Sequence, residues 1–320
     1  MTLDTLDKKI INCLNENTKS QYSEIAKKCN SSKEVISYRI KNLQTKGIIK
    51  EFVTIFGFGY WSNKILISFS KIDNTREEEI INFLKSHSNI NWITPCSGSW
   101  DMVFSIMAKN PKHFDELLRK ILKEIGENIS QYKMGTSVGS YTFGHTYILG
   151  KTTEPKKKET ENKNRKITFD KKDKEIAKII HTNARTKLIN ISIQTKIPVD
   201  TVKYRIKKME ENKIIKRYRM ILDPSKLGYN RYEIFLQCIN LTEQKIKQFY
   251  NFAKNSPNIE YLSKCVGSWN IEFTVHFKTN QELRNFVLNV KKEFGEIIQN
   301  FETITLFETY NFIYFPKELR

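Results

Sequence analysis

Two short basic segments carry the most distinctive side-chain chemistry in this 320-residue sequence. One is Val35-Ile36-Ser37-Tyr38-Arg39-Ile40-Lys41, and the other is Thr201-Val202-Lys203-Tyr204-Arg205-Ile206-Lys207. In each, apolar residues recur at helical spacing and leave lysine, arginine and tyrosine on the other side. A basic helix with one apolar stripe is typical of the helix that enters the major groove of DNA. A single copy would fit a basic surface helix equally well, so the repetition favours the DNA interpretation.

The candidate DNA contacts lie on these two helices and shortly after the second. Basic side chains bind phosphate oxygens, whereas side chains that reach base edges read the sequence. Arg39 and Arg205 are expected to bind a phosphate or an acidic side chain rather than a guanine. Tyr38 and Tyr204 suit a DNA contact or a packing role equally. The predicted DNA-binding residues are Lys33, Ser37, Tyr38, Arg39, Lys41, Lys203, Tyr204, Arg205, Lys207, Lys208, Arg217 and Arg219.

The two segments differ at positions where sequence reading would take place. Ser37 in the first corresponds to Lys203 in the second. Since identical helices read a palindrome, differing helices are expected to read an imperfect one. Residues 168–222 hold fifteen Lys/Arg and six Asp/Glu, whereas residues 1–52 hold ten and six. The second segment should therefore bind phosphate more strongly and depend more on salt.

The overall composition favours the same class of partner. Lys+Arg number 54 and Asp+Glu 35, a net charge of +19, which favours double-stranded DNA ahead of a membrane surface. A bias toward Lys, Asn and Ile in the genome can supply part of this charge. The five cysteines have no CxxC spacing, which argues against disulfides or zinc and predicts buried thiols in a reducing cytoplasm. No apolar run is long enough to span a membrane, and no metal or cofactor is expected.

The elements that would position these helices are duplicated along the chain. Residues 7–50 align with 173–216 without gaps, with 12 identities in 44 positions. Farther on, the offset becomes 169, so that Cys96 and Gly98-Ser99-Trp100 correspond to Cys265 and Gly267-Ser268-Trp269. The chain is therefore predicted to be a tandem duplication.

Each copy opens with three helical patterns followed by a strand, the order of a winged helix-turn-helix. In the first copy, Ser31-x-x-Glu34 predicts a capping box at the start of the third helix. In the second copy, Ile197 takes the cap position and Pro198 the first helical position. The strands near 48–52 and 214–220 are predicted to form the wings.

The remainder of each copy has the order β-α-β-β-α-β of a ferredoxin-like sandwich. In the first copy, strands are predicted at 64–72, 90–96, 101–108 and 130–148, with helices at 76–87 and 111–126. The second copy repeats this order across 231–239, 243–254, 259–265, 270–278, 280–294 and 298–315. One face of each sheet is expected to pack on helices and the other on a partner sheet.

This order of elements resembles the Lrp/AsnC (feast/famine) family of transcription regulators. The resemblance covers nearly the whole chain outside the linker, and it rests on Leu6-Asp7, Tyr38-Arg39-Ile40-Lys41-Asn42-Leu43, Gly47-Ile48-Ile49, Asp223-Pro224, Leu227-Gly228-Tyr229 and the two Gly-Ser-Trp turns. It implies an α+β fold with two winged helix-turn-helix domains, each followed by a ferredoxin-like domain of the Lrp type. The predicted domains are 1–55, 60–149, a basic flexible linker at 150–167, 168–224 and 228–316.

Family members usually carry one unit per chain and dimerise through their sheets. The resemblance therefore implies an internal pseudo-dimer, with sheet 64–148 packed on sheet 231–315, that acts as a sequence-specific transcriptional regulator in the cytoplasm. Assembly into a homodimer or higher oligomer is left open. The family binds small amino acids near a glycine-aspartate turn, which implies an effector site at Gly98, Ser99, Trp100, Asp101, Gly267, Ser268, Trp269 and Asn270. Because serines and Asn270 replace family aspartates there, a tight turn with a packed tryptophan is the alternative.

Two other functions stay open at this point. Sirohaem decarboxylases resemble the same family, but their chemistry needs imidazole groups, and none of the five histidines here has a histidine at its repeat-equivalent position. An architectural protein that coats DNA without sequence preference would also use the positive charge. The ratio of specific to random DNA affinity distinguishes this last function from regulation.

Overall fold

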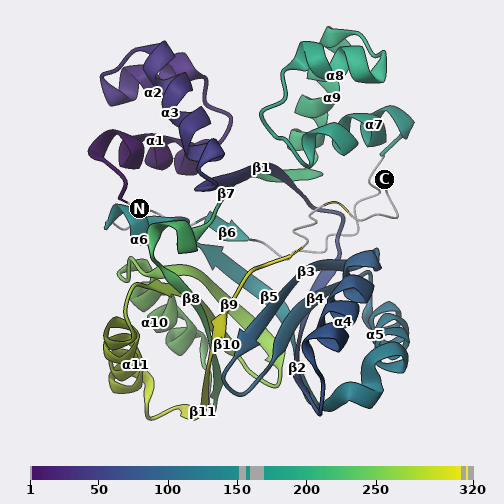
Figure 1. Ribbon diagram of the computed structural model, residues 1–320, viewed down its shortest axis with the longest axis vertical. Coiled ribbons are helices and arrows are strands. Elements are labelled where there is room, and N and C mark those ends of the chain that lie inside the picture. Colours follow the sequence, from purple (N-terminus) through teal and green to yellow (C-terminus); the bar gives the residue numbers. More distant parts are fainter. Residues whose placement is uncertain (1, 151–155, 159–168, 311–314, 316–320) are drawn as a thin grey trace. The chain divides into compact units, whose positions relative to one another are not determined.

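The computed structural model describes residues 2–150, 156–158, 169–310 and 315, and Figure 1 labels its elements. By internal contacts the chain divides into two compact units, and each takes parts of both sequence repeats. One unit comprises 1–58, 163–227 and 314–320, and the other comprises 59–162 and 228–313. The two winged helices thus belong to one unit and the two ferredoxin-like modules to the other.

The first winged helix consists of α1 (Thr5–Glu16), α2 (Tyr22–Cys29), α3 (Lys33–Thr45) and β1 (Ile49–Phe56). The Oγ of Ser32 accepts a hydrogen bond from the Val35 amide at 3.2 Å and so caps α3. The predicted capping box at Ser31 is therefore wrong: the cap is Ser32, and Glu34 takes no part in a capping box. The physical reason is that the Ser31 amide donates to the Ala26 carbonyl at 3.0 Å, which completes the end of α2.

The second winged helix consists of α7 (Lys171–Ile180), α8 (Leu188–Thr195), α9 (Val199–Glu211) and β7 (Ile215–Leu222), followed by the 3₁₀ turn Pro224–Leu227. Pro198 occupies the N-cap position of α9, which has no side-chain cap. The sequence placed Pro198 one residue later, inside the helix, and this prediction is wrong. Ile197, which was expected at the cap, is buried in the core of this winged helix instead.

The strand after each recognition helix pairs with its counterpart from the other copy. β1 and β7 form a two-stranded antiparallel sheet in which Val53 lies opposite Arg219 and Ile55 opposite Arg217. Most of β1 is buried, and Phe56 enters the hydrophobic core of the second winged helix together with Phe315. Both predicted wing segments are strands, and each satisfies its backbone groups on the other, a pairing that the sequence did not predict.

The predicted β-α-β-β-α-β order is found in both modules. The first contains β2 (Trp61–Phe69), α4 (Asn74–Ser86), β3 (Ile90–Ser97), β4 (Met102–Ala108), α5 (Pro111–Ile125), the 3₁₀ turn Gly126–Asn128 and β5 (Ile129–Thr142). The second contains β8 (Asn230–Cys238), α10 (Glu243–Lys254), β9 (Ile259–Gly267), β10 (Ile271–Phe277), α11 (Asn280–Phe294) and β11 (Ile298–Leu306). Their strand orders, β5-β2-β4-β3 and β11-β8-β10-β9, are equivalent and confirm the α+β fold class.

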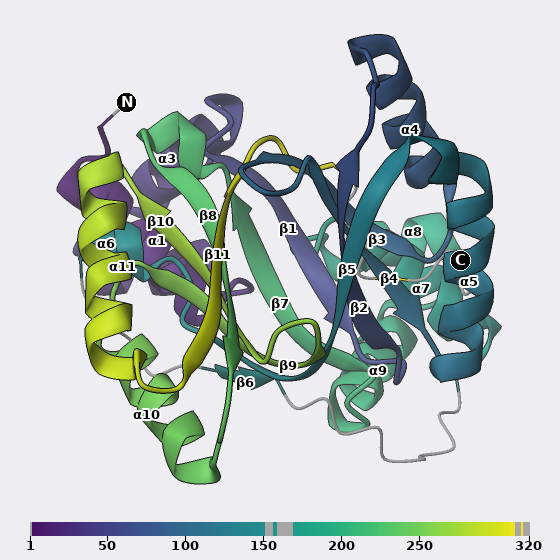
Figure 2. The same cartoon turned by 90° about the horizontal axis from the view of Figure 1, so that it is seen from below.

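The two sheets face each other and are also joined at both edges. β3 pairs with β11, β5 pairs with β9, and the β2–β5 pairing closes the strands into a ring. The facing sides share a core that includes Leu66, Trp100, Phe235, Trp269 and Ile304. Packing of sheet on sheet was expected, whereas the edge pairing was not. Figure 2 shows α4 and α5 outside one sheet and α10 and α11 outside the other.

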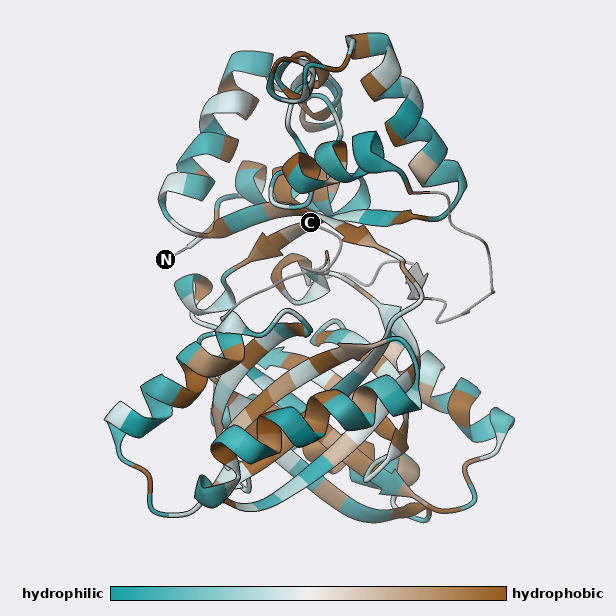
Figure 3. Cartoon of the chain, turned by 90° about the vertical axis from the view of Figure 1, so that its right-hand side faces the viewer, coloured by the Kyte–Doolittle hydropathy of each residue, from teal (hydrophilic) through white to brown (hydrophobic). Residues whose placement is uncertain are grey.

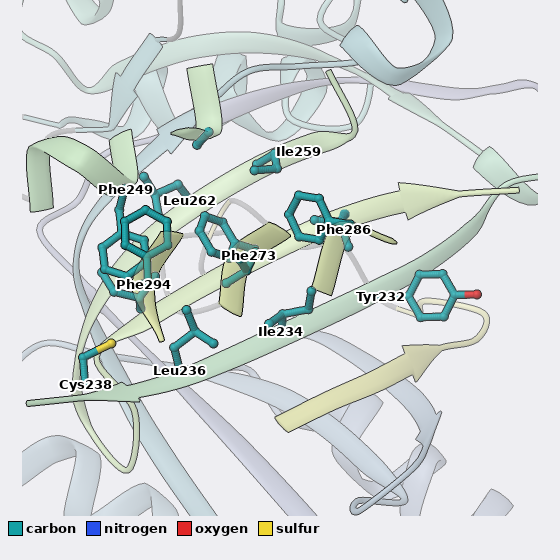
Figure 4. Close-up of a cluster of buried hydrophobic side chains, with 14 of the residues drawn as sticks. Tyr232, Ile234, Leu236, Cys238, Phe249, Ile259, Leu262, Phe273, Phe286 and Phe294 are labelled. Carbon is teal, nitrogen blue, oxygen red and sulfur yellow. The ribbon is translucent and has the colours of Figure 1, made fainter. Parts of the chain in front are cut away.

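The helices pack on the outer faces of the sheets because each has one apolar side. Figure 3 shows hydrophobic and hydrophilic residues alternating around them. In the second module, Phe249 of α10 and Phe294 of α11 stack with ring centroids 3.8 Å apart beside Phe273 of β10 (Figure 4). Burying each such side chain contributes about 2 kcal/mol. The first module has an equivalent core that includes Ile81, Leu84, Phe104 and Ile121.

Several predicted boundaries differ from the structure, and the strand expected at 64–72 is β2 at Trp61–Phe69. β5 ends at Thr142, and Thr146–Leu149 forms the short helix α6, which stops at Gly150 in the left-handed conformation. β11 ends at Leu306 rather than near 315. Within the predicted flexible linker, Lys156–Lys158 forms β6 on the edge of β5, and the remaining linker residues from 151 to 167 lie outside the described residues.

Candidate nucleic-acid interface

The third helix of each winged helix presents a basic face to solvent. Its other face is held in the core by Ile36, Ile40 and Leu43 in α3 and by Val202, Ile206 and Met209 in α9. The exposed lysines of these helices are Lys33, Lys41, Lys203, Lys207 and Lys208, while Ser37 is half-buried. Tyr38 and Tyr204 are 68% and 63% exposed, which removes the packing role that the sequence left open for them.

Arg39 and Arg205 point into ion pairs within the protein. Arg39 Nη1 lies 2.6 Å from Asp4 Oδ2, and Arg205 Nη1 lies 2.8 Å from Asp170 Oδ2. Each guanidinium donates hydrogen bonds to its carboxylates, and these bonds raise the pKa of both arginines. Each acid also caps the first helix of its winged helix, since Asp4 accepts from the Asp7 amide and Asp170 from the Asp173 amide. The arginines therefore tie each recognition helix to the first helix of the same winged helix.

A second pair of cationic side chains, Lys19 and Arg185, contacts the opposite winged helix. Arg185 donates to the carbonyls of Thr18 and Ser20, and its guanidinium lies 5.4 Å from the Phe52 ring centroid. Lys19, its repeat-equivalent, lies 4.4 Å from the centroid of the Tyr218 ring. Phe52 and Tyr218 are equivalent as well, so the contact is reciprocal. Sequence reasoning missed this pair, although the 166-residue offset already matched Lys19 to Arg185.

The two remaining predicted DNA contacts, Arg217 and Arg219, lie on β7 and are half-buried. They lie opposite Ile55 and Val53 of β1 in the antiparallel pair. The structure therefore brings together, on each recognition helix, the exposed lysines and the tyrosine. It places Arg39, Arg205, Arg217 and Arg219 in protein contacts or in the paired strands.

The predicted effector residues form two equivalent hairpin turns. Gly98 and Gly267 have φ values of +124° and +137°, a region that side chains disfavour. Trp100 and Trp269 are each 2% exposed, and their indole N–H groups donate to Glu302 and Glu272 respectively. This is the packed-tryptophan arrangement that the sequence held as an alternative.

The acid-to-amide difference between the turns leaves their geometry unchanged. Asp101 Oδ2 accepts from the Phe69 amide at 2.7 Å, and Asn270 Oδ1 accepts from the Cys238 amide at 2.6 Å. An amide oxygen performs this task as well as a carboxylate oxygen. The turns touch the other module: the Ser268 amide donates to the Met134 carbonyl, and a Cβ added at Gly98 would lie 3.0 Å from the Thr303 carbonyl oxygen. Ser99 is exposed.

A buried charged cluster lies between the facing sheets and was not predicted. Lys64 Nζ lies 2.8 Å from Glu233 Oε2 and also contacts Glu272. Burial opposes the charge on Lys64, but the two carboxylates outweigh it and raise the pKa of the ammonium group. Burial raises the pKa of Glu272 as well. In the sequence these three residues are isolated polar positions in strands, which carry no signal of proximity.

The chemistry of the thiols agrees with the sequence. All five cysteines are free and buried, as expected. Burial raises the pKa of Cys238 to about 11, so its thiol stays protonated at neutral pH. Among the described residues, no three His, Cys, Asp or Glu side chains come together as metal ligands. No described helix is long and apolar enough to cross a membrane.

Comparison with protein families and with curated proteins matches the chain to DNA-binding proteins. A family model described as winged helix-turn-helix DNA-binding matches residues 3–50 and again 169–216. Among curated proteins, the HTH-type transcriptional regulator FL11 of Pyrococcus horikoshii is 27% identical over 122 residues, which are 38% of this chain and 80% of FL11. FL11 of Pyrococcus furiosus is 27% identical over 119 residues, 37% of this chain and 78% of its own.

A solved structure matches almost the entire chain. The sirohaem decarboxylase NirDL covers 97% of this chain and 93% of its own, with a TM-score of 0.64 and 12% sequence identity. At that identity the likeness concerns the fold alone. The arrangement of two winged helices and two ferredoxin-like modules in one chain is therefore found in another protein.

Proposed function

Because the chain belongs to the Lrp/AsnC family of transcriptional regulators, tandemly duplicated, we propose that it binds double-stranded DNA sequence-specifically and regulates transcription. One observation carries the proposal: two exposed basic helices, α3 and α9, belong to one unit and are joined through β1 and β7. In this proposal the chain acts as an internal pseudo-dimer with two reading helices, in the compartment that holds the DNA. Half-sites for such pairs lie roughly 34 Å or a multiple apart.

The two helices are proposed to read different half-sites. Ser37 and Lys203 occupy equivalent positions near the middle of α3 and α9, and one is neutral whereas the other is cationic. A lysine in the major groove favours guanine, whose edge presents two acceptors, while a serine is compatible with several bases. Lys41 and Lys207 are equivalent and exposed, and we assign them to phosphate. The target is therefore an imperfect palindrome.

The experiment compares Lys203→Ala with Lys171→Ala in a gel-shift titration at fixed salt. Both lysines are exposed, but Lys203 is on the recognition helix and Lys171 opens α7. Loss of a base contact costs about 1–3 kcal/mol of specific binding, whereas loss of one peripheral charge costs less. We expect Lys203→Ala to weaken binding to the specific site about tenfold more than Lys171→Ala. Equal losses would contradict the assignment.

A second part of the proposal is that a small effector molecule regulates the protein. An amino acid or similar molecule would be sensed at the turns Gly98–Asp101 and Gly267–Asn270, since each turn contacts a strand of the other module. A molecule bound there would couple the two modules directly. Thermal-shift screening against the amino acids tests this, and the absence of any shift would leave the turns with a packing role only. Association of chains into a homodimer or higher oligomer belongs to the same part of the proposal.

The likeness of fold to NirDL keeps a second function in view, namely decarboxylation of a tetrapyrrole. The sequence favours regulation over this chemistry, because no histidine has a histidine at its repeat-equivalent position. Anaerobic titration with sirohaem, followed by absorbance, separates the two functions. A stoichiometric spectral change with release of carbon dioxide would favour the enzyme. An architectural role would appear as equal affinity for specific and random DNA at physiological salt.

A further inference from the structure

Repeat-equivalent residues of the two modules contact each other at two places. Lys64 of β2 meets Glu233 of β8, and Lys133 of β5 meets Glu302 of β11. In both pairs the partners are 169 residues apart, the offset that relates the two modules. Residues that are equivalent and also touch must lie near the axis that relates the modules. At such an axis a symmetric dimer places like residues together.

The charges at this axis have diverged into complementary sets. The first module supplies the cations Lys64 and Lys133, and the second supplies the carboxylates Glu233 and Glu302. Glu272 adds a further carboxylate to the second module, whereas its equivalent in the first is the buried Val103. Lys64 and Glu233 side chains are only 12% and 2% exposed, so water does little to screen them.

Pairing of like modules would leave these charges unpaired. Two first modules would bring Lys64 to Lys64 and Lys133 to Lys133 without an acid at the Val103 position. Two second modules would gather Glu233, Glu272 and Glu302 from both copies with no cation among these axis positions. Removing the partner of a buried charge is strongly destabilising because the charge stays out of water.

We propose that these axis charges make the pairing face of the first module selective for the second module and exclude a second copy of itself. The partner that this surface accepts is a module of opposite charge, which each chain carries within itself. The chain thereby assembles as an internal heterodimer and does not exchange modules with other chains. This selectivity does not depend on DNA binding.

Charge exchange in the full chain tests the proposal. Two half-exchanged chains, Lys64→Glu/Lys133→Glu and Glu233→Lys/Glu302→Lys, have like charges at the axis. The fully exchanged chain carries all four substitutions and restores opposite charges. It also keeps a lysine near Glu272, because Glu272 lies opposite Phe235, two residues from position 233. All three variants use the same positions, so packing changes are matched.

We expect each half-exchanged chain to melt roughly 10 °C below the wild type, and the fully exchanged chain to recover most of that loss. When a tagged half-exchanged chain is co-expressed with the other, untagged one, the two should copurify in equal amounts. Tagged wild type should bind a half-exchanged chain no more than it binds untagged wild type in a parallel co-expression. That last amount measures association through other surfaces.

Three outcomes would overturn the proposal. They are a fully exchanged chain no more stable than the half-exchanged ones, no copurification of the two half-exchanged chains, or equal copurification with wild type. If a half-exchanged chain does not fold alone, the neutral variants Lys133→Gln and Glu302→Gln and their double mutant provide a second measurement. The double mutant should then lose less in melting temperature than the two single losses together. Additive losses would show that the pair contributes no selectivity.

Discussion

At the scale of single residues, the repeated Tyr-Arg-Ile-Lys segment places its side chains in three different environments. The tyrosine and lysine are exposed, the isoleucine is buried, and the arginine bridges two helices. Helical periodicity predicted the isoleucine correctly. It could not predict the arginine, because its partners Asp4 and Asp170 precede it by 35 residues and meet it only after folding. The ion pairs within the protein are therefore sufficient to explain why an arginine occupies this position of each recognition helix.

Substitution of Arg205 separates this structural role from a phosphate contact. Arg205→Ala removes hydrogen bonds to Asp170 and Asp173, and the partial exposure of the pair limits the loss to about 1–2 kcal/mol of unfolding free energy. In Arg205→Ala, the slope of log DNA affinity against log salt concentration should be the same as in the wild type. Lys207→Ala should do the opposite, with unchanged stability and a slope reduced by about 1. Urea unfolding and salt titrations measure both quantities.

The opposite result for Arg205→Ala would contradict this assignment. A reduced salt slope with unchanged unfolding free energy would mean that Arg205 binds phosphate and that its ion pairs contribute little. Arg205→Lys is the useful companion, since lysine keeps the charge but not the geometry that reaches both carboxylates. It should restore only part of the stability.

At the scale of elements, the glycines of the Gly-Ser-Trp turns allow the two modules to approach each other closely. A Cβ added at Gly267 would come within 2.5 Å of the Met134 carbonyl oxygen, which belongs to β5 of the other module. The backbone there also has a φ of +137°. The turn therefore approaches the neighbouring strand closely because it has no side chain, and the Ser268 amide donates to the same carbonyl at 2.9 Å.

Gly267→Ala should therefore destabilise the protein by at least about 2 kcal/mol, through backbone strain and displacement of β5. Gly139→Ala is the matched control, because Gly139 lies on β5 in the same β5–β9 pair, and an added Cβ there meets nothing within 4 Å. That control should change stability by less than about 1 kcal/mol. Thermal unfolding of both variants makes the comparison. Equal effects would mean that the close approach at Gly267 can relax without cost.

Elements were predicted well where the signal is local and poorly where it is not. The order of helices and strands follows from periodicity within each segment, and it was right in both modules. The pairing of β1 with β7 and of β3 with β11 could not be predicted, because an alternating strand carries the same pattern whichever strand it joins. The cap of α3 was ambiguous for a different reason: Ser31 and Ser32 are both competent, and the end of α2 decides between them.

At the scale of the whole molecule, duplication lets equivalent positions acquire different residues. The alignment of the repeats identified which residues correspond, but it did not predict that equivalent residues would contact each other, as Lys64 and Glu233 do. A one-unit protein that forms a symmetric dimer has identical residues at such positions. Within one chain, each copy is free to specialise, and the recognition helices have done so at Ser37 and Lys203.

This divergence leads to a prediction about the DNA target. Selection of binding sites from randomised DNA should yield two non-identical half-sites for the wild type. Ser37→Lys gives the first recognition helix the cation that the second carries, so its half-site should shift toward that of the second. Ser23→Lys adds the same charge at an exposed position of α2, outside the recognition helix, and should raise affinity without changing either half-site. If both variants select the wild-type sequence, position 37 does not read bases, and the asymmetry of the target must come from other positions at which α3 and α9 differ.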